Sequence, residues 1–202
     1  IPAPLLEDLG YRYTLATLLV VLSLLRTQSH KIGDTSNVPT WTEAEGKTTG
    51  MLRLALNAIA IGIVLVYLVW PPLARWAMFE VPTEVRGLGA LLAAVAMPLF
   101  WWVNAALGAN FSATLHLKKT HTLVTHGPYR YVRHPMYTVL FTILIGFGLL
   151  AANWVTLASG LALTVLICAT RTPKEEKMMA DAFGQDYATW AAKTGRFFPK
   201  IF

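Results

Sequence analysis

HTLVTHGPYRYVRHPMY, residues 121–137, lies between strongly apolar segments although it holds three histidines, three tyrosines, two arginines, two prolines and a glycine. Polar groups are costly in a membrane chain unless protein, water or a ligand satisfies them. The stretch therefore predicts a binding site in which these polar groups have partners. A second polar segment, RTPKEE at 171–176, follows the last apolar run. We expect the two segments to form one ligand site at a membrane surface.

The composition predicts an integral membrane protein of one domain, because the 202 residues are 55% hydrophobic and only 14% charged. Soluble domains carry about 25% charge. The net charge of +6 would suggest nucleic acid in a soluble chain. Here we attribute it to basic residues that set membrane topology, so no nucleic-acid partner is expected. The single cysteine, Cys168, excludes an internal disulfide and gives no metal cluster.

Five apolar runs predict an all-α fold with about five transmembrane helices, at 11–25, 51–70, 86–107, 135–150 and 154–169. A spanning helix needs about 20 residues. The first run is shorter, and we expect a short or tilted span there rather than a signal peptide, because no small-x-small cleavage site follows it. Only residues 151–153 separate the last two runs, which predicts an antiparallel helical hairpin.

The segments between the runs have plainer interpretations. Residues 27–50 are a polar connector, with a role in substrate access as the alternative. Residues 73–83 form an interfacial link whose Trp76 and Phe79 suit the headgroup region. Trp101 and Trp102 are either part of the aromatic belt or a wall of a substrate site.

The basic residues predict an orientation for five spans. With the N-terminus outside, all of the 17 lysines and arginines except Arg12, Arg75 and Arg86 fall on cytoplasmic segments. The polar stretch at 121–137 and the C-terminal tail then face the cytoplasm together.

His134-Pro135 predicts the start of a helix, because proline suits the first helical position and the residue before it avoids the α region. A helix start offers unpaired N–H groups and a positive dipole end, which suit an anion. His134 either adds a hydrogen bond or only caps the span, and Tyr137 lies on the same face. His126-Gly127-Pro128 indicates a turn. His116 and His121 lack the nearby acid of a metal site, so no metal is expected.

Thr172-Pro-Lys-Glu175 reads as a capping box, with Thr172 at the N-cap and Glu175 at N3. Arg171 either extends to the interface or binds an acidic group through its planar fork. There is no serine or cysteine nucleophile paired with a base, and no phosphate-binding glycine motif. The residues by themselves therefore indicate a membrane-embedded, anion-binding site on the cytoplasmic side.

The C-terminal half resembles the isoprenylcysteine carboxyl methyltransferase family and its wider membrane methyltransferase superfamily over about residues 100–202. The matching residues are His121-Thr-Leu-Val124, Gly127-Pro-Tyr129, Arg133-His-Pro-Met-Tyr137, Arg171-Thr-Pro-Lys-Glu-Glu176, Phe183-Gly-Gln-Asp-Tyr187, Lys193-Thr-Gly195 and Phe198-Pro199. Lys174 stands where some relatives carry another acid.

The resemblance implies an S-adenosylmethionine-dependent methyltransferase that acts on a lipid-like or prenylated substrate from the bilayer. Residues 1–107 would supply spans and residues 108–202 the catalytic, cofactor-binding half of a single membrane domain. Arg171 would orient a substrate carboxylate, and Glu175 would be catalytic and contact the cofactor. The other implied cofactor contacts are His116, His121, Thr122, Leu123, Val124, Tyr129, His134, Pro135, Met136 and Tyr137.

Three other functions stay open at this point. A phospholipid N-methyltransferase shares the cofactor motif, although Arg171 disfavours a cationic headgroup. A sterol-reductase-like protein shares a similar C-terminal bundle but is usually longer. A non-catalytic membrane accessory protein would keep the fold without turnover. The sequence leaves the methyl acceptor and the oligomeric state open.

Overall fold

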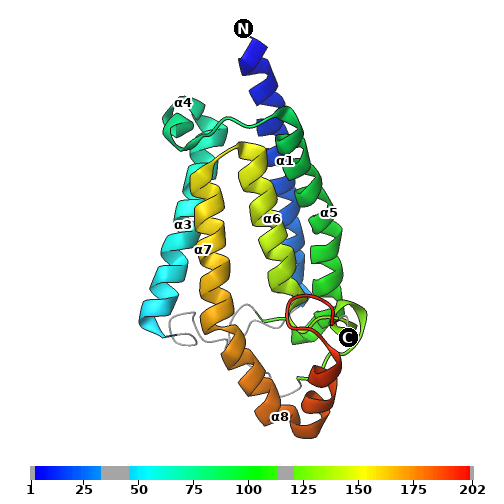
Figure 1. The fold of residues 1–202 in the computed structure, drawn as a ribbon. Helices are drawn as coiled ribbons and strands as arrows, with labels where there is room; N and C mark the ends of the chain where they lie inside the picture. The colour runs from blue at the N-terminus through cyan, green and yellow to red at the C-terminus, as the bar shows by residue number, and fades with distance from the viewer. Residues whose placement is uncertain (1–2, 33–45, 113–120, 201–202) are drawn as a thin grey trace.

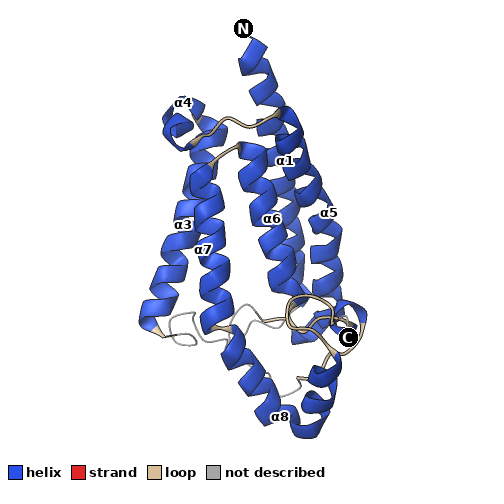
Figure 2. Cartoon of the chain, in the orientation of Figure 1, coloured by secondary structure: helices blue, strands red, loops and turns tan. Residues whose placement is uncertain are grey.

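The computed structural model describes residues 3–32, 46–112 and 121–200, and every element named within them is a helix (Figure 2). Four helical segments are long and apolar enough to cross a membrane, and a fifth is apolar but shorter. The prediction of an all-α integral membrane fold is confirmed. The five apolar helices are α1 (Ala3–Ile32), α3 (Lys47–Val69), α5 (Thr83–Leu107), α6 (Pro135–Ala151) and α7 (Trp154–Thr170).

Four of the predicted spans agree with the structure to within four residues at either end, but the first does not. The short span expected at 11–25 is a helix of 30 residues. At about 1.5 Å per residue it is longer than a hydrocarbon core is thick, so its polar ends extend beyond the apolar layer. The connector predicted at 27–50 is correspondingly shorter, because its ends belong to α1 and α3. The suggested access role concerns residues 33–45, which lie outside the described residues.

Short elements connect the spans. The interfacial link begins with α4 (Pro71–Ala74) and η1 (Arg75–Ala77), and exposed Trp76 packs edge-on against Trp154 at 5.8 Å between ring centroids. Trp101 and Trp102 are both about half exposed, which suits a place in the aromatic belt. Neither lines the cavity that is described below. The remaining elements are η2 (Gly108–Asn110), η3 (Gly127–Arg130) and α8 (Thr172–Lys193).

The hairpin between α6 and α7 is confirmed. Ala152 adopts a left-handed conformation with φ 49° and ends α6. Fully buried Asn153 then caps α7 by accepting a hydrogen bond from the Thr156 backbone N–H at 3.0 Å. The two helices run antiparallel and side by side in Figure 1.

Two glycines allow α5 and α6 to pack closely. A Cβ added at Gly146 would lie 2.8 Å from the Ala93 nitrogen and 2.8 Å from the Gly89 carbonyl oxygen. A Cβ at Gly89 would lie 2.6 Å from the Leu150 nitrogen. Small residues at such crossings let membrane helices gain van der Waals contact that a lipid tail would otherwise replace.

A polar cluster joins four helices at the end of the bundle where α6 meets α7. The Arg86 guanidinium donates to Asp8 at 3.1 Å, to the Tyr67 hydroxyl at 2.8 Å and to the Leu150 carbonyl at 2.9 Å. The Tyr67 hydroxyl donates to Asp8 at 2.8 Å, and the guanidinium lies 3.7 Å from the centre of the Tyr11 ring. Arg86, predicted only as a topology signal, thus links α1, α3, α5 and α6.

The opposite end of the bundle carries both segments singled out in the sequence. Figure 1 shows η3, the start of α6 and the whole of α8 together at the lower end, with the C-terminus beside them. The prediction that the two polar segments meet at one end is confirmed.

Gly146→Ala is expected to lower the free energy of unfolding by about 1–3 kcal/mol, because the added methyl group overpacks the α5–α6 contact. Gly62→Ala is the matched control, since a Cβ there meets nothing within 4 Å. Denaturation of both variants in detergent measures the difference. Equal stability of the two variants would contradict the close contact.

Candidate active site

A cavity of about 660 Å³ opens between α1, α3, α6, α7 and the start of α8. Its wall within the apolar layer is made of side chains such as Leu19, Ala60, Ile143, Phe147 and Leu163. Its wall at the α8 end is polar. A cavity of this size and polarity suits a small molecule with an apolar part and a charged part.

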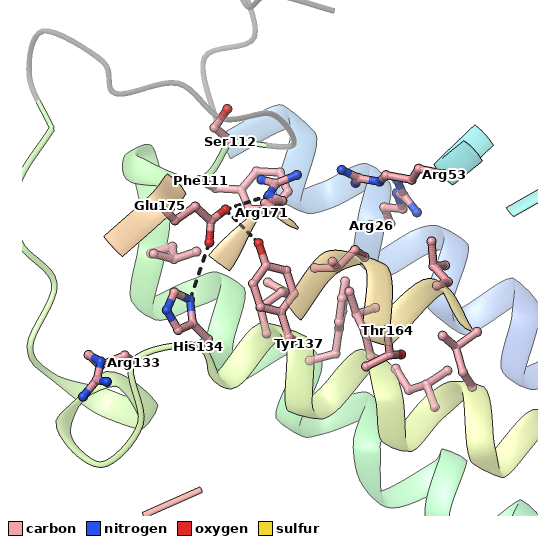
Figure 3. A pocket seen from close by; sticks show the side chains of 18 of the residues that line it. Arg26, Arg53, Phe111, Ser112, Arg133, His134, Tyr137, Thr164, Arg171 and Glu175 are labelled. Atoms are coloured by element: carbon pink, nitrogen blue, oxygen red, sulfur yellow. Dashed lines mark hydrogen bonds and ion pairs between the residues drawn. The ribbon is translucent and has the colours of Figure 1, made fainter. Parts of the chain in front are cut away.

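The Glu175 carboxylate is the centre of the polar wall (Figure 3). Its Oε1 accepts hydrogen bonds from the Tyr137 hydroxyl and from Arg171 Nε, both at 2.7 Å. Its Oε2 lies 3.5 Å from His134 Nδ1. Arg171 is 6% exposed, so it faces the cavity and does not extend to the membrane interface. Charge-assisted bonds of this kind make it possible to bury an ion pair.

The capping box predicted at 172–175 is wrong. Only Arg171 separates α7 from α8, and the Glu175 N–H donates to the Arg171 carbonyl at 2.9 Å as in a continuing helix. Thr172 is fully buried, and its hydroxyl has no hydrogen-bond partner among the described residues. With the backbone donors already satisfied by the preceding turn, the Glu175 side chain turns into the cavity.

Glu176 points the other way and binds three basic side chains. Its carboxylate accepts from Arg133 Nε at 3.2 Å and from Arg196 at 3.1 and 2.6 Å, and it lies 3.1 Å from His134 Nε2. His134 therefore sits between two adjacent carboxylates. Burial disfavours the charged imidazole, but the hydrogen bonds and charges of Glu175 and Glu176 outweigh burial and raise the pKa of His134.

Backbone hydrogen bonds, in addition to the Glu176–Arg196 pair, hold the C-terminal tail against the start of α6. The Arg133 N–H donates to the Gly195 carbonyl at 2.8 Å, and the His134 N–H to the Arg196 carbonyl at 3.0 Å. The Gly195 N–H donates to the Tyr131 carbonyl at 3.1 Å. These bonds form a short parallel pairing around Val132 and Gly195. They place the tail against the start of α6.

A kink in α8 brings its second half back over the site. Gly184 has φ 50° and ψ −120°, a conformation that favours glycine. Beyond it, Tyr187 and Trp190 line the cavity, and the Trp190 indole donates to the Tyr129 carbonyl at 3.0 Å. The FGQDY segment quoted above thus contains the kink that shapes the cavity.

The structure brings most of the predicted site residues together. The His134 and Tyr137 rings stack at 5.7 Å, as expected for one face of a helical turn. Thr122 is exposed and bonded to Asn110, while Leu123 and Pro135 do not line the cavity. His116 lies outside the described residues. The predicted residues that line the cavity are His121, Val124, Tyr129, His134, Met136, Tyr137, Arg171 and Glu175.

Several cavity residues were missed. Arg26 on α1 and Arg53 and Asn57 on α3 line the cavity, although the sequence suggested only a topology role for the two arginines. Arg53 and Asn57 are four residues apart in an apolar span, which puts both on one helix face. That spacing in an apolar span could have identified them as residues of a common site. Glu176 and Arg196 were not identified as partners, because their pairing depends on how the tail folds back.

The fold and the cavity define an integral membrane protein with a cavity whose wall is charged at one end of the helix bundle. The isoprenylcysteine carboxyl methyltransferase (ICMT) family matches residues 88–181 of the chain. The resemblance inferred from the sequence is therefore confirmed over that segment, which includes Arg133-His-Pro-Met-Tyr137 and both glutamates.

The chain is similar to curated proteins with two different kinds of name. The chain is 31% identical over 96 residues to protein-S-isoprenylcysteine O-methyltransferase of Tribolium castaneum, covering 46% of this chain and 34% of the relative. It is 36% identical over 86 residues to the cobalt-zinc-cadmium resistance protein CzcN of Cupriavidus metallidurans, covering 42% and 38%. The matches cover between 34% and 52% of the length of the curated relatives.

A solved structure supports the fold. The eukaryotic intramembrane Ras methyltransferase ICMT aligns with a TM-score of 0.62 at 20% identity, covering all of this chain and 70% of that one. The arrangement of the helices is thus shared beyond the segment with sequence similarity.

Glu176→Gln is expected to loosen the tail, because a neutral amide loses the ionic bonds to Arg133 and Arg196. The N–H groups of Arg133, His134 and Gly195 should exchange with solvent roughly 10–100 times faster, in line with about 1.5–3 kcal/mol for bonds to a charged group. Hydrogen exchange read by mass spectrometry measures this. Asp181→Asn is the control, since its pair with Lys177 is exposed. Unchanged hydrogen exchange at these N–H groups in Glu176→Gln would contradict a role of Glu176 in holding the tail.

Protein stability is expected to fall as the pH rises above 6.5. A histidine whose pKa is raised in the fold stabilises the fold fully below its unfolded pKa of 6.5 and loses that contribution as the pH passes the folded value. His134→Gln should lower the thermal midpoint at pH 6 and flatten its fall with pH. His126→Gln, at an exposed position, is the control. Parallel pH curves for the wild type and His134→Gln would contradict the pairing.

Proposed function

We propose that the protein is an integral membrane methyltransferase that uses S-adenosylmethionine to methylate the carboxylate of a lipid-like acceptor, an isoprenylcysteine or a similar isoprenoid. The observation that carries the proposal is the hydrogen-bonded group of Arg171, Glu175, Tyr137 and His134 at the polar end of an apolar cavity. The similarity to protein-S-isoprenylcysteine O-methyltransferases supports the reaction type.

The residues present fit the cofactor. S-Adenosylmethionine supplies an electrophilic methyl group on a sulfonium when it is bound. Glu175 suits its ammonium or ribose hydroxyl groups, and the start of α6 at Pro135 suits its carboxylate. Buried Tyr129 and Val124, with Trp190, give the flat, apolar wall that an adenine ring needs. The cavity volume lies within the range of about 300–1,000 Å³ usual for small-molecule sites.

Arg171 is proposed to hold the acceptor. Glu175 binds the Nε edge of the guanidinium and so fixes its plane. A guanidinium held in this way can orient a carboxylate through its fork. An ionised carboxylate is already a nucleophile, so no general base is required. Holding the reacting groups close and away from water then supplies much of the rate.

N-Methylation of a phospholipid is less well supported. Glu175 is the single acid among the described residues that line the cavity, whereas Arg26, Arg53, Arg133 and Arg171 all line it. An amine acceptor needs a base to deprotonate it, and Glu175 is already paired with Arg171. A carboxylate acceptor needs no base.

The apolar wall is proposed to hold the acceptor's lipid tail. We further propose that the site and the C-terminus face the cytoplasm and the N-terminus lies outside, following the positive-inside rule. Residues 108–202 would bind the cofactor, and residues 1–107 would supply spans together with Arg26 and Arg53 on the acceptor side.

The reaction type is tested with S-adenosylmethionine labelled in its methyl group and a short prenylcysteine. Alkali treatment of the labelled lipid should release labelled methanol, because a carboxyl methyl ester is cleaved by base. Arg171→Gln should lower kcat/KM roughly 10–100-fold, as expected for loss of a charged hydrogen bond. Arg75→Gln, an exposed arginine at the other end of the bundle, is the control. Alkali-stable label in a headgroup would contradict carboxyl methylation.

A further inference from the structure

The apolar part of the cavity is elongated, because two neighbouring helices line it over several turns each. On α6 the lining side chains share one helix face and include Leu140, Ile143 and Phe147. On α7 they begin at Thr156 and continue to Ile167. At about 1.5 Å per residue, the stretch between these two residues is ~16 Å long. The cavity can therefore hold an extended chain that lies along both helices.

The polar group described above lies at one end of this apolar part. Arg171 follows Ile167 by one helical turn, and Tyr137 precedes Leu140 on α6. Figure 3 shows Glu175, Tyr137 and Thr164 one after another along the cavity. A molecule whose carboxylate is bound at Arg171 would thus have its apolar part directed along α6 and α7.

Buried side chains close the other end. Both helices are described over their whole length, and neither contributes a lining residue beyond Phe147 and Thr156. Thr156 is held by Asn153, which accepts hydrogen bonds from its N–H at 3.0 Å and its hydroxyl at 3.3 Å. One turn beyond Phe147, fully buried Leu150 accepts a hydrogen bond from Arg86. The cavity therefore ends inside the bundle, with the buried Phe147 side chain at its closed end.

We propose that Phe147 determines acceptor specificity, because it limits the acceptor's tail to about the length of a farnesyl chain. This inference rests on the proposed function, which places the acceptor carboxylate at Arg171. An extended polypeptide advances about 3.6 Å per residue of three bonds, which is ~1.2 Å per bond. A farnesyl chain of about 12 bonds then spans ~14 Å and fits between Ile167 and Thr156. A geranylgeranyl chain is roughly 5 Å longer, and its last isoprene unit would meet the Phe147 ring.

The test compares the geranyl, farnesyl and geranylgeranyl forms of N-acetyl-S-prenylcysteine at equal mole fraction in detergent micelles, so that every tail leaves a similar apolar medium. Methyl transfer from S-adenosylmethionine should show the highest kcat/KM with farnesyl. It should be about tenfold lower with geranylgeranyl, as expected for an overpacked site.

Three cavity variants should change this order. Phe147→Ala should bring geranylgeranyl level with farnesyl, because the lost ring has about the size of one isoprene unit. Phe147→Leu, a milder change to the core, should do so in part. Ala60→Phe, which adds a ring to the cavity wall on α3, should make geranyl the preferred chain. Phe141→Ala is the matched control on α6, since Phe141 does not line the cavity, and it should keep the wild-type order.

Binding is measured separately from turnover, as the rise in thermal midpoint that each probe causes without cofactor. A farnesyl optimum that Phe147→Ala moves to geranylgeranyl supports the length limit even where no methyl transfer occurs, and in that case the proposed reaction alone fails. Methyl transfer at equal kcat/KM with farnesyl and geranylgeranyl would overturn the length limit and leave the proposed function in place. The tail would then pass sideways into the lipid, for example beside exposed Ile61. An equal loss with all three probes in Phe147→Ala and Phe147→Leu would also overturn it, because the ring would then only support the fold.

Discussion

Two adjacent carboxylates at the start of α8 organise the polar end of the molecule. Consecutive residues on a helix point about 100° apart, so Glu175 and Glu176 face different surroundings. Glu175 turns into the cavity toward Arg171 and Tyr137, and Glu176 turns toward Arg133 and Arg196 on the tail side. His134 lies between them and contacts both. The His134 imidazole thereby connects the cavity wall with the C-terminal tail.

This arrangement follows from the difficulty of placing charges at a membrane. A buried charge must be paired and hydrogen-bonded, or it shifts to its neutral form. The bundle keeps such groups at its two ends. Asp8, Tyr67 and Arg86 satisfy one another at one end, and the two glutamates are surrounded by bases at the other. The apolar helices between them pack through the Gly89–Gly146 contact and leave room for a ligand's apolar part.

Much of this fold could be predicted from the sequence because hydrophobic length and proline positions mark membrane spans directly. The three-residue link at 151–153 gave the hairpin, and His134-Pro135 gave the start of α6. The length of α1 could not be read in this way, since polar residues continue a helix beyond the apolar layer at little cost. The capping box failed at Thr172 because a local motif does not show whether the preceding helix continues. Arg26 and Arg53 were overlooked as cavity residues because their place depends on how α1 and α3 pack around α6 and α7.

We propose that Glu175 and its partners hold S-adenosylmethionine at the polar end of the cavity. Equilibrium binding of labelled S-adenosylmethionine to the purified protein in lipid nanodiscs tests this role. We expect saturable binding that Glu175→Gln weakens at least tenfold and that the exposed Asp181→Asn leaves unchanged. Absence of binding to the wild type, or equal affinity of the wild type and Glu175→Gln, would contradict it.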